Sequence, residues 1–158
     1  MKLQKELKLK QPLASLNHEA LLSLVRTSTL MQKLSNRFFS KFDLTDVQFN
    51  ILMILKEHGN EGLSQQELSE QLVVGKSNVV GLVDRLERAG YVKRTSHPSD
   101  RRFNQIVLAP KGAKLEQRVE QSYFREVDRM LNVLTGAEKK VLIHAMEKIR
   151  QFMLTSEI

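Results

Sequence analysis

Cysteine is absent from this 158-residue chain, and its absence removes several kinds of chemistry at once. Without cysteine the protein forms no disulfide, no thiolate metal site and no thiol-based redox switch. Long apolar runs are absent as well, since no stretch approaches the roughly 18 residues that a membrane span needs. The absence of cysteine fits a reducing compartment, so we expect a cytoplasmic protein with no membrane partner.

Motifs for catalysis and metal binding are also missing. The sequence contains no nucleophile motif, no phosphate-binding glycine loop and no paired carboxylates suited to acid–base catalysis. No two of the histidines lie within one helical turn of each other, so no local pair of metal ligands exists. We therefore predict that the protein is not an enzyme, binds no metal and needs no cofactor. A metal site assembled from distant parts of the chain is the weaker alternative.

The net charge of +7 is unevenly distributed along the chain. Residues 1–10 carry four lysines and one glutamate, and residues 74–104 carry seven basic and three acidic side chains. A focused basic patch indicates an anionic partner, and nucleic acid is favoured over a membrane surface. The basic N-terminus has no uninterrupted apolar segment, so we expect no secretory signal there and interpret it as a frayed tail.

Apolar residues recur at intervals of three and four along the first part of the chain. This spacing predicts a helix over residues 17–41, with Asn17 as its N-cap. A second helix is predicted to begin at Thr45, which forms a capping box with Gln48, and to end at Gly59.

Two shorter helices are predicted next, joined by a tight turn at Gly75. The first begins with the capping box of Ser64 and Glu67, and the second ends at Gly90. The apolar stripe of the second helix is formed by Val79, Leu82, Val83 and Leu86. Two short helices joined in this way are typical of a helix-turn-helix.

Two short strands are predicted after these helices, over residues 90–95 and 105–108, because β-branched and aromatic residues gather there. The loop between them reads SHPSDRRFN and contains two adjacent arginines. Helix resumes at Pro110, and a last helix begins at Thr135, whose capping partner is Glu138. This order predicts a mainly α protein whose middle part is a winged helix-turn-helix, with the arginine-bearing loop as the wing.

Two stretches of the sequence resemble motifs of the MarR (multiple antibiotic resistance regulator) family of bacterial transcription factors. Residues 63–94 read LSQQELSEQLVVGKSNVVGLVDRLERAGYVKR, and residues 100–112 read DRRFNQIVLAPKG. The second stretch is similar to the family's Asp-x-Arg wing followed by Leu-Thr-x-x-Gly. Two positions depart from the pattern: Ala109 stands where Thr is usual, and Val80 stands where Ser or Thr is common.

The resemblance implies a homodimeric, ligand-responsive repressor. Residues 1–44 and 110–158 would form a helical dimerisation region, and residues 45–109 would form the DNA-binding lobe. Two such lobes would bind double-stranded DNA at a palindromic operator. Members of the family commonly respond to small organic molecules, so a small organic effector is expected, but one sequence does not identify the residues of its pocket.

The second helix of the helix-turn-helix is interpreted as the recognition helix. Its first turn contains Lys76, Ser77 and Asn78, and the N-terminal residues of such a helix meet base edges in the major groove. Asn pairs with adenine, Lys favours guanine, and Val80 suits a thymine methyl group. Helix capping is the alternative role for Ser77 and Asn78.

Phosphate contacts are expected on both sides of that turn. Ser64 and Gln65 begin the preceding helix, whose N–H groups would suit a phosphate, although the capping box explains Ser64 equally well. Arg85 is expected to bind phosphate or Asp100. The other basic residues nearby are interpreted as solvated surface: Arg88, Lys93 and Arg94.

The two arginines of the wing are expected to have different roles. Arg102 matches the arginine of the Asp-x-Arg motif and is expected to enter the minor groove, whose narrow, negative form attracts arginine. Arg101 is expected to contact a phosphate. Pairing of Arg102 with Asp100 or with Asp84 would brace the wing, and this role is compatible with DNA contact.

A winged-helix scaffold used only for protein contacts is the rival class of function. Such a scaffold has no need of Lys76, Arg101 and Arg102 together, so the sequence favours a DNA-binding transcriptional regulator. A metal-sensing regulator is a third hypothesis, and the spacing of the histidines disfavours it.

Overall fold

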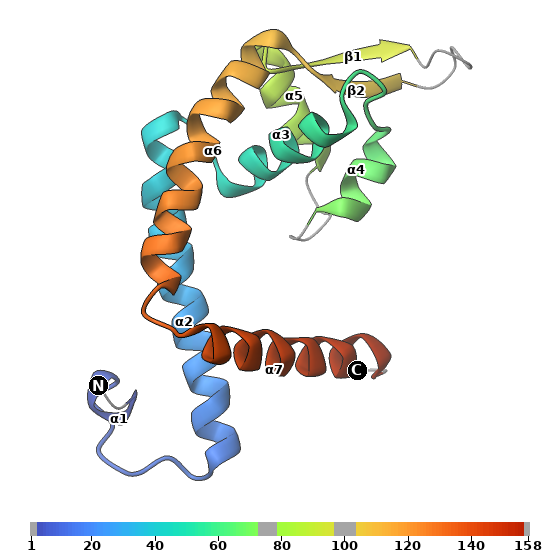
Figure 1. The fold of residues 1–158 in the computed structure, drawn as a ribbon. Helices are drawn as coiled ribbons and strands as arrows, with labels where there is room; N and C mark the ends of the chain where they lie inside the picture. The colour runs from blue at the N-terminus through green and yellow to red at the C-terminus, as the bar shows by residue number, and fades with distance from the viewer. Residues whose placement is uncertain (1–2, 73–78, 97–103, 157–158) are drawn as a thin grey trace. The chain divides into compact units, whose positions relative to one another are not determined.

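The computed structural model describes residues 3–72, 79–96 and 104–156. It divides into two compact units, Met1–Ala113 and Lys114–Ile158, which are described separately. The described elements are, in chain order, α1 (Leu3–Glu6), α2 (Leu16–Phe39), the 3-10 turn η1 (Ser40–Phe42), α3 (Asp46–His58), α4 (Gln65–Gln71), α5 (Val79–Arg88), β1 (Val92–Ser96), β2 (Asn104–Leu108), α6 (Pro110–Leu131) and α7 (Gly136–Thr155) (Figure 1). None of the described helices is both long and apolar enough to cross a membrane.

The mainly helical fold with a two-stranded wing is confirmed, and local capping explains where several helices begin. Three predicted capping boxes are present, formed by Thr45 with Gln48, Ser64 with Glu67, and Thr135 with Glu138. In each box the hydroxyl accepts a backbone N–H and the longer side chain accepts the N–H of the capping residue.

Two expectations about the N-terminal part are wrong. The N-cap of α2 is Ser15 and not Asn17, because Ser15 has extended backbone angles and its Oγ accepts the N–H of His18 at 3.2 Å. The frayed tail that the sequence suggested also contains the short helix α1. Glu6 at its end accepts a hydrogen bond from Nε of Arg26 in α2 at 2.6 Å, which ties α1 to the long helix.

The wing sheet includes a contact from the chain segment before α4. Strands β1 and β2 pair antiparallel from Val92↔Leu108 to Ser96↔Asn104. On the other side of β2, Leu63 and Ile106 exchange two backbone hydrogen bonds, with N–O distances of 3.0 and 2.7 Å. This bridge holds the start of α4 against the wing.

The core of the first unit lies between α3, α4, α5 and the wing strands. Helix α3 contacts α2, α4, α5 and β2, and α5 contacts β1. The buried apolar side chains of this unit are Phe39, Leu44, Phe49, Ile51, Leu52, Leu55, Leu63, Leu68, Val79, Val83, Leu86, Val92, Ile106 and Val107. Three members of the predicted stripe on α5 are thus buried, so the opposite side of this helix remains at the surface.

The turn after α5 joins this helix to the start of α6. Gly90 has a φ of 75°, its N–H donates to the carbonyl of Glu87 at 2.8 Å, and the N–H of Tyr91 donates to that of Leu86 at 2.9 Å. These paired bonds form a Schellman C-cap and confirm Gly90 as the predicted stop. The carbonyl of Tyr91 then accepts the N–H of Ala109 at 3.0 Å, just before α6 begins.

The first turn of α6 packs closely on this C-cap. Nζ of Lys111 donates to the carbonyl of Ala89 at 2.8 Å and lies 4.9 Å from the centre of the Tyr91 ring. A Cβ atom at Gly112 would lie 2.0 Å from the carbonyl oxygen of Tyr91. Only glycine therefore fits at this position without a movement of the backbone.

The second unit contains the rest of α6, a turn, and α7. No residue of α7 is buried, although this helix carries many apolar side chains. Those exposed in the structure are Val141, Leu142, Ile143, Ile149, Phe152, Met153 and Leu154. A helix with so much exposed apolar surface is typical of a protein that buries it against a partner.

We predict that Gly112→Ala lowers the free energy of unfolding by about 1–3 kcal/mol, because the added methyl group overlaps backbone atoms. Gly136→Ala is the matched control, since nothing lies within 4 Å of a Cβ there and alanine favours helix. Urea denaturation of both variants measures the difference. Equal stability of the two variants would contradict the close packing of α6 on Tyr91.

Candidate nucleic-acid interface

Helices α4 and α5 form a helix-turn-helix that packs on α3. Both helices contact α3 and each other, and α5 also contacts strand β1 of the wing (Figure 1). Since Val79, Val83 and Leu86 are buried, α5 is held by one face and presents the other. The structure therefore brings the predicted recognition helix and the wing together in one unit.

Several of the predicted contact residues lie outside the described residues. They are Lys76, Ser77 and Asn78 before α5, and Asp100, Arg101 and Arg102 in the loop between the strands. Their roles stay predictions. Among the described candidates, Val80 and Arg85 lie on α5 and are exposed, and the Val80 side chain is 54% accessible. Their exposure is what contact with a large partner requires.

Ser64 and Gln65 lie at the start of α4. Ser64 is the N-cap: its Oγ accepts the N–H of Glu67 at 3.2 Å, and its own N–H donates to the Glu67 carboxylate at 2.8 Å. Both Ser64 and Gln65 are half-buried. The capping role of Ser64 is thus observed, and a phosphate contact from either residue stays a prediction.

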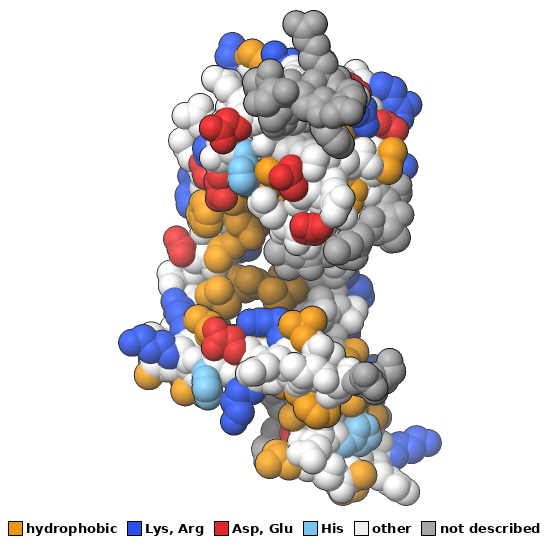
Figure 2. Space-filling model, turned by 90° about the vertical axis from the view of Figure 1, so that its right-hand side faces the viewer, with side chains coloured by type: hydrophobic (Ala, Val, Ile, Leu, Met, Phe, Trp, Pro, Cys, Tyr) orange, Lys and Arg blue, Asp and Glu red, His pale blue; other side chains and the backbone are white. Residues whose placement is uncertain are grey.

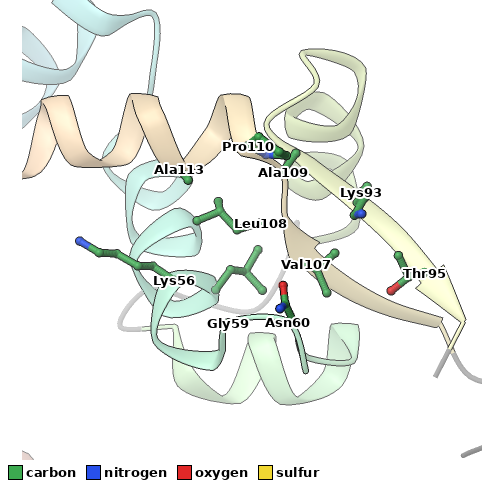
Figure 3. A pocket seen from close by; sticks show the side chains of 11 residues that line it. Lys56, Gly59, Asn60, Lys93, Thr95, Val107, Leu108, Ala109, Pro110 and Ala113 are labelled. Carbon is green, nitrogen blue, oxygen red and sulfur yellow. The ribbon is translucent and has the colours of Figure 1, made fainter. Parts of the chain in front are cut away.

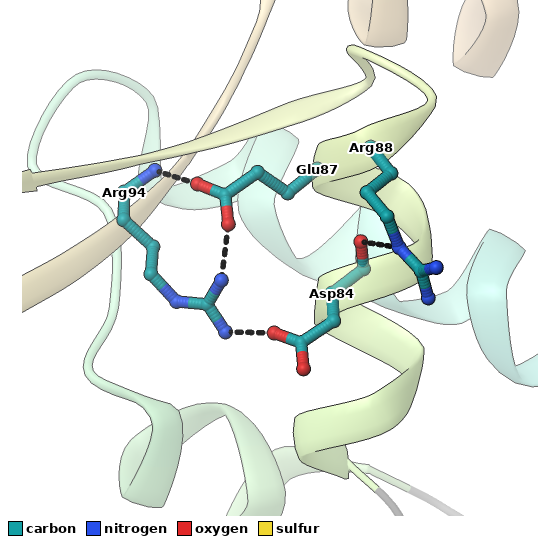
Figure 4. Close-up of polar contacts among 4 residues, drawn as sticks. All are labelled: Asp84, Glu87, Arg88 and Arg94. Carbon is teal, nitrogen blue, oxygen red and sulfur yellow. Dashed lines mark hydrogen bonds and ion pairs between the residues drawn. The ribbon is translucent and has the colours of Figure 1, made fainter.

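Asp84 on α5 pairs with Arg94, whereas the sequence had suggested Arg102 as a partner. Its Oδ1 accepts a hydrogen bond from Nη2 of Arg94 in β1 at 2.6 Å (Figure 4). Nη1 of Arg94 forms an ion pair with Oε2 of Glu87, and the backbone N–H of Arg94 donates to Oε1 of Glu87 at 3.0 Å. The recognition helix and the first wing strand are therefore joined by three hydrogen bonds from one residue.

The interpretation of Arg94 as solvated surface is wrong, and the sequence contained a signal that could have corrected it. Arg94 follows Val92 by two positions, so both side chains lie on the same face of β1, and Val92 is buried. Asp84 and Glu87 are three residues apart and share one face of α5. An arginine on the inner face of a strand, opposite two carboxylates on one helix face, predicts this cluster.

The charge of Arg94 is reinforced by its surroundings. The side-chain hydrogen bond with Asp84 is the largest cause that raises the pKa of Arg94, and Glu87 raises it further, while partial burial lowers it. The carboxylates of Asp84 and Glu87 therefore favour the charged form of the guanidinium group. With formal charges of +1 on Arg94 and −1 on each of its two partners, the cluster has a formal charge of −1.

Arg88 also lies on α5, and its hydrogen bond stays within this helix. Its Nε donates to the backbone carbonyl of Asp84 in the same helix at 3.3 Å (Figure 4). Arg88 and Arg85 are both exposed, which agrees with the solvated surface expected of Arg88.

A pocket of about 540 Å³ lies in the first unit, beside the base of the wing. Its walls come from the end of α3, from both wing strands and from the start of α6 (Figure 3). The lining residues are Leu55, Lys56, Gly59, Asn60, Lys93, Thr95, Val107, Leu108, Ala109, Pro110 and Ala113. None of them is acidic and two are lysines, of which Lys56 extends away from the other lining side chains (Figure 3).

No metal site is formed in the part of the chain that the structure describes. No group of three or more histidine, aspartate or glutamate residues within it could hold a metal ion.

Known proteins are similar to this chain in sequence. Residues 42–102 match the sequence model of the MarR family. An uncharacterised HTH-type transcriptional regulator of Bacillus cereus is 30% identical over 138 residues, which are 87% of this chain and 90% of the relative. The HTH-type transcriptional repressor YetL of Bacillus subtilis is 32% identical over 126 residues, which are 79% of this chain and 75% of the relative.

Solved structures agree in fold. A MarR family transcriptional regulator of Streptomyces coelicolor, solved in complex with DNA, superposes with a TM-score of 0.78 at 24% identity and covers 94% of each chain. CouR of Rhodococcus jostii, solved with p-coumaroyl-CoA, superposes with a TM-score of 0.70 at 23% identity and covers 92% of this chain and 98% of its own. On its winged helix-turn-helix and its similarity to curated relatives such as these two, the chain belongs to the MarR family of DNA-binding HTH-type transcriptional regulators.

Proposed function

We propose that the protein is a ligand-responsive repressor that binds a palindromic operator as a homodimer. The observation that carries this proposal is the joined pair of DNA-reading elements, in which α5 packs on α3 and α4 by one face and is tied to wing strand β1. The relative YetL, which is named a repressor, supports repression as the direction of control.

The proposed contacts with base edges come from the start of the recognition helix. Lys76, Ser77 and Asn78 immediately precede α5 in the sequence, and Val80 is exposed on its first turn. Asparagine and lysine supply the hydrogen bonds that distinguish adenine and guanine in the major groove. Val80 supplies an apolar contact for a thymine methyl group.

The proposed backbone contacts surround this reading element. Arg85 on α5, and Ser64 and Gln65 at the start of α4, are placed in the same lobe and would bind phosphates. In the wing, Arg101 would bind a phosphate and Arg102 would enter the minor groove. Asp100 would brace the wing from the loop, and Asp84 already pairs with strand β1 through Arg94.

Dimerisation is proposed to involve the helices at both ends of the chain, residues 1–44 and 110–158. Exposed apolar side chains are frequent on these helices, and hydrophobic side chains are visible on the surface in Figure 2. Those on α2 are Leu16, Leu21, Val25, Leu30, Met31 and Leu34, in addition to those on α7. A twofold dimer would bury such faces and place two lobes on a twofold-symmetric DNA site.

A small organic molecule is the proposed signal. The chain has no cysteine to sense oxidants, and CouR, which shares the fold, is bound to p-coumaroyl-CoA. A ligand that binds better to the form that cannot hold DNA must weaken DNA binding by the same factor. The pocket beside the wing has lysines and no acidic residue in its lining, so an anionic organic molecule suits it better than an amine.

The scaffold hypothesis has less support than the DNA-binding regulator. The relatives that match most of the chain are named transcriptional regulators, and residues 74–104 carry a net positive charge around the helix-turn-helix and wing. A protein-interaction scaffold requires no such charge.

The wing and recognition-helix contacts can be tested separately on operator DNA. Arg102→Ala is expected to weaken binding to most sequences, with the largest loss at sites flanked by a narrow A·T tract. Asn78→Ala is expected to relax preference at one base pair, at a cost of about 1–3 kcal/mol. Arg101→Ala is expected to reduce the salt slope of binding by roughly one unit.

Fluorescence anisotropy titrations over a range of salt concentrations measure these effects, with melting temperatures recorded to control for folding. Binding of Arg102→Ala at parental affinity would contradict a DNA-contacting wing.

Substitutions of Ser64 separate helix capping from phosphate contact. Ser64→Ala is expected to lower stability by about 1 kcal/mol because the N-cap is lost. Ser64→Asp keeps a capping oxygen, so stability is retained, but its negative charge would repel a phosphate and lower DNA affinity. Unchanged DNA affinity of Ser64→Asp would assign Ser64 to capping alone.

Light scattering tests the proposed dimer. We expect the mass of two chains at micromolar concentration, because the exposed apolar faces of α2 and α7 favour association. A charged residue on the exposed apolar surface of α7, as in Val141→Glu, should shift the protein toward monomer. A parental mass of one chain at the same concentration would overturn the dimer.

A further inference from the structure

Strand β1 is an edge strand, and a carboxylate of the recognition helix caps its outer side. Strand β2 pairs with β1 on one side and with Leu63 on the other, so β2 is the inner strand. The N–H of Arg94 points away from β2 and donates to Glu87 at 3.0 Å. An edge-strand donor that would otherwise face water is thus bound to α5.

The side chain of the same residue adds a second attachment. Its two terminal nitrogens bind two carboxylates one helical turn apart, Asp84 at 2.6 Å and Glu87 (Figure 4). A planar guanidinium group that binds two fixed acceptors allows little rotation, whereas a single ammonium group would. The backbone and side chain of Arg94 together fix both the distance and the angle between β1 and α5.

This attachment lies directly before the loop that carries the wing arginines. The chain runs from Arg94 through Thr95 and Ser96 into that loop. The position of β1 relative to α5 therefore decides where the loop begins relative to the base-reading turn. Simultaneous reading of a major groove and the adjacent minor groove requires a fixed offset between these two elements.

We infer that Arg94, held by Glu87 and Asp84, is a positioning residue that sets the offset between wing and recognition helix and thereby the affinity for the operator. Arg94 acts through the wing and does not itself contact DNA. This inference rests on the proposed minor-groove contact of Arg102, which depends on the placement of the wing.

If the cluster affected DNA binding only through its charge, one substitution would change the affinity in the opposite direction. Glu87→Gln removes a negative charge from the lobe that faces DNA, so charge alone would strengthen binding. Loss of the ion pair and of one strong acceptor for Arg94 would instead release β1 and weaken binding. The sign of the change separates the two roles.

The experiment compares variants of the full chain on a duplex that the parent protein has selected from a random pool. Arg94→Lys keeps the charge but loses the two-armed geometry, and Glu87→Gln keeps the shape but loses the charge. Arg88→Gln is the matched control, because it removes a positive charge whose described hydrogen bond lies within the same helix. Arg102→Ala is the reference for loss of the wing contact.

Arg94→Lys and Glu87→Gln are each expected to lower affinity about tenfold, a loss comparable to that of one or two DNA contacts. Hydroxyl-radical footprints should lose protection at the flanks, where the wing lies, and keep it at the centre of each half-site. Arg88→Gln should keep the flanking protection and weaken binding no more than about threefold. Circular dichroism identifies a temperature at which every variant is folded, and binding is measured there.

Parental affinity and flanking protection in Arg94→Lys would overturn the inference, and so would tighter binding by Glu87→Gln. If Arg102→Ala weakens binding while these variants do not, the wing contact stands and the positioning role of Arg94 fails. If the parent selects no duplex, the proposed sequence-specific DNA binding is contradicted. If Arg102→Ala binds as tightly as the parent, the proposed wing contact is contradicted.

Discussion

The attachment of strand β1 to helix α5 through Arg94 is the constraint on which the rest of this lobe depends. A helix-turn-helix fixes one reading element, and a wing adds a second only if its position relative to the first is constant. Arg94 keeps this position constant: its backbone N–H and its side chain bind Glu87, and its side chain also binds Asp84. Each bond is partly exposed and modest alone, but three bonds from one residue restrict the strand in distance and in angle.

A second junction on the same helix has a complementary effect. The C-terminal end of α5 closes on Gly90, and the following Tyr91 accepts a hydrogen bond from the residue before α6. Nζ of Lys111 then donates to the carbonyl of Ala89, the residue directly after α5, and Gly112 allows the two backbones to approach. The recognition helix is thus fixed to β1 along its side and to the start of α6 at its end.

The sequence predicted the features that depend on residues close together in the chain. It did not predict the features that depend on contacts between residues far apart in the chain. The capping boxes at Thr45, Ser64 and Thr135 depend on residues three positions apart, and the Gly90 stop depends on a positive φ, so both are readable from the chain. The start of α2 was misplaced because Ser15 and Asn17 are both good capping residues, and backbone angles decide between them. The role of Arg94 and the bridge from Leu63 to Ile106 depend on tertiary contacts, which only the folded chain displays. The wing arginines and the residues before α5 lie outside the described residues, so sequence and family remain their support.

Selection of duplexes from a random pool by the parent protein tests sequence-specific DNA binding without assuming an operator or an effector. We expect enrichment of two inverted half-sites about one helical turn apart, centre to centre, with A·T-rich steps at the flanks where the wings would lie. We also expect the enriched duplex to bind far more tightly than unselected DNA at the same salt concentration. Recovery of no common sequence, with binding that depends only on salt, would contradict a sequence-specific regulator with a reading wing.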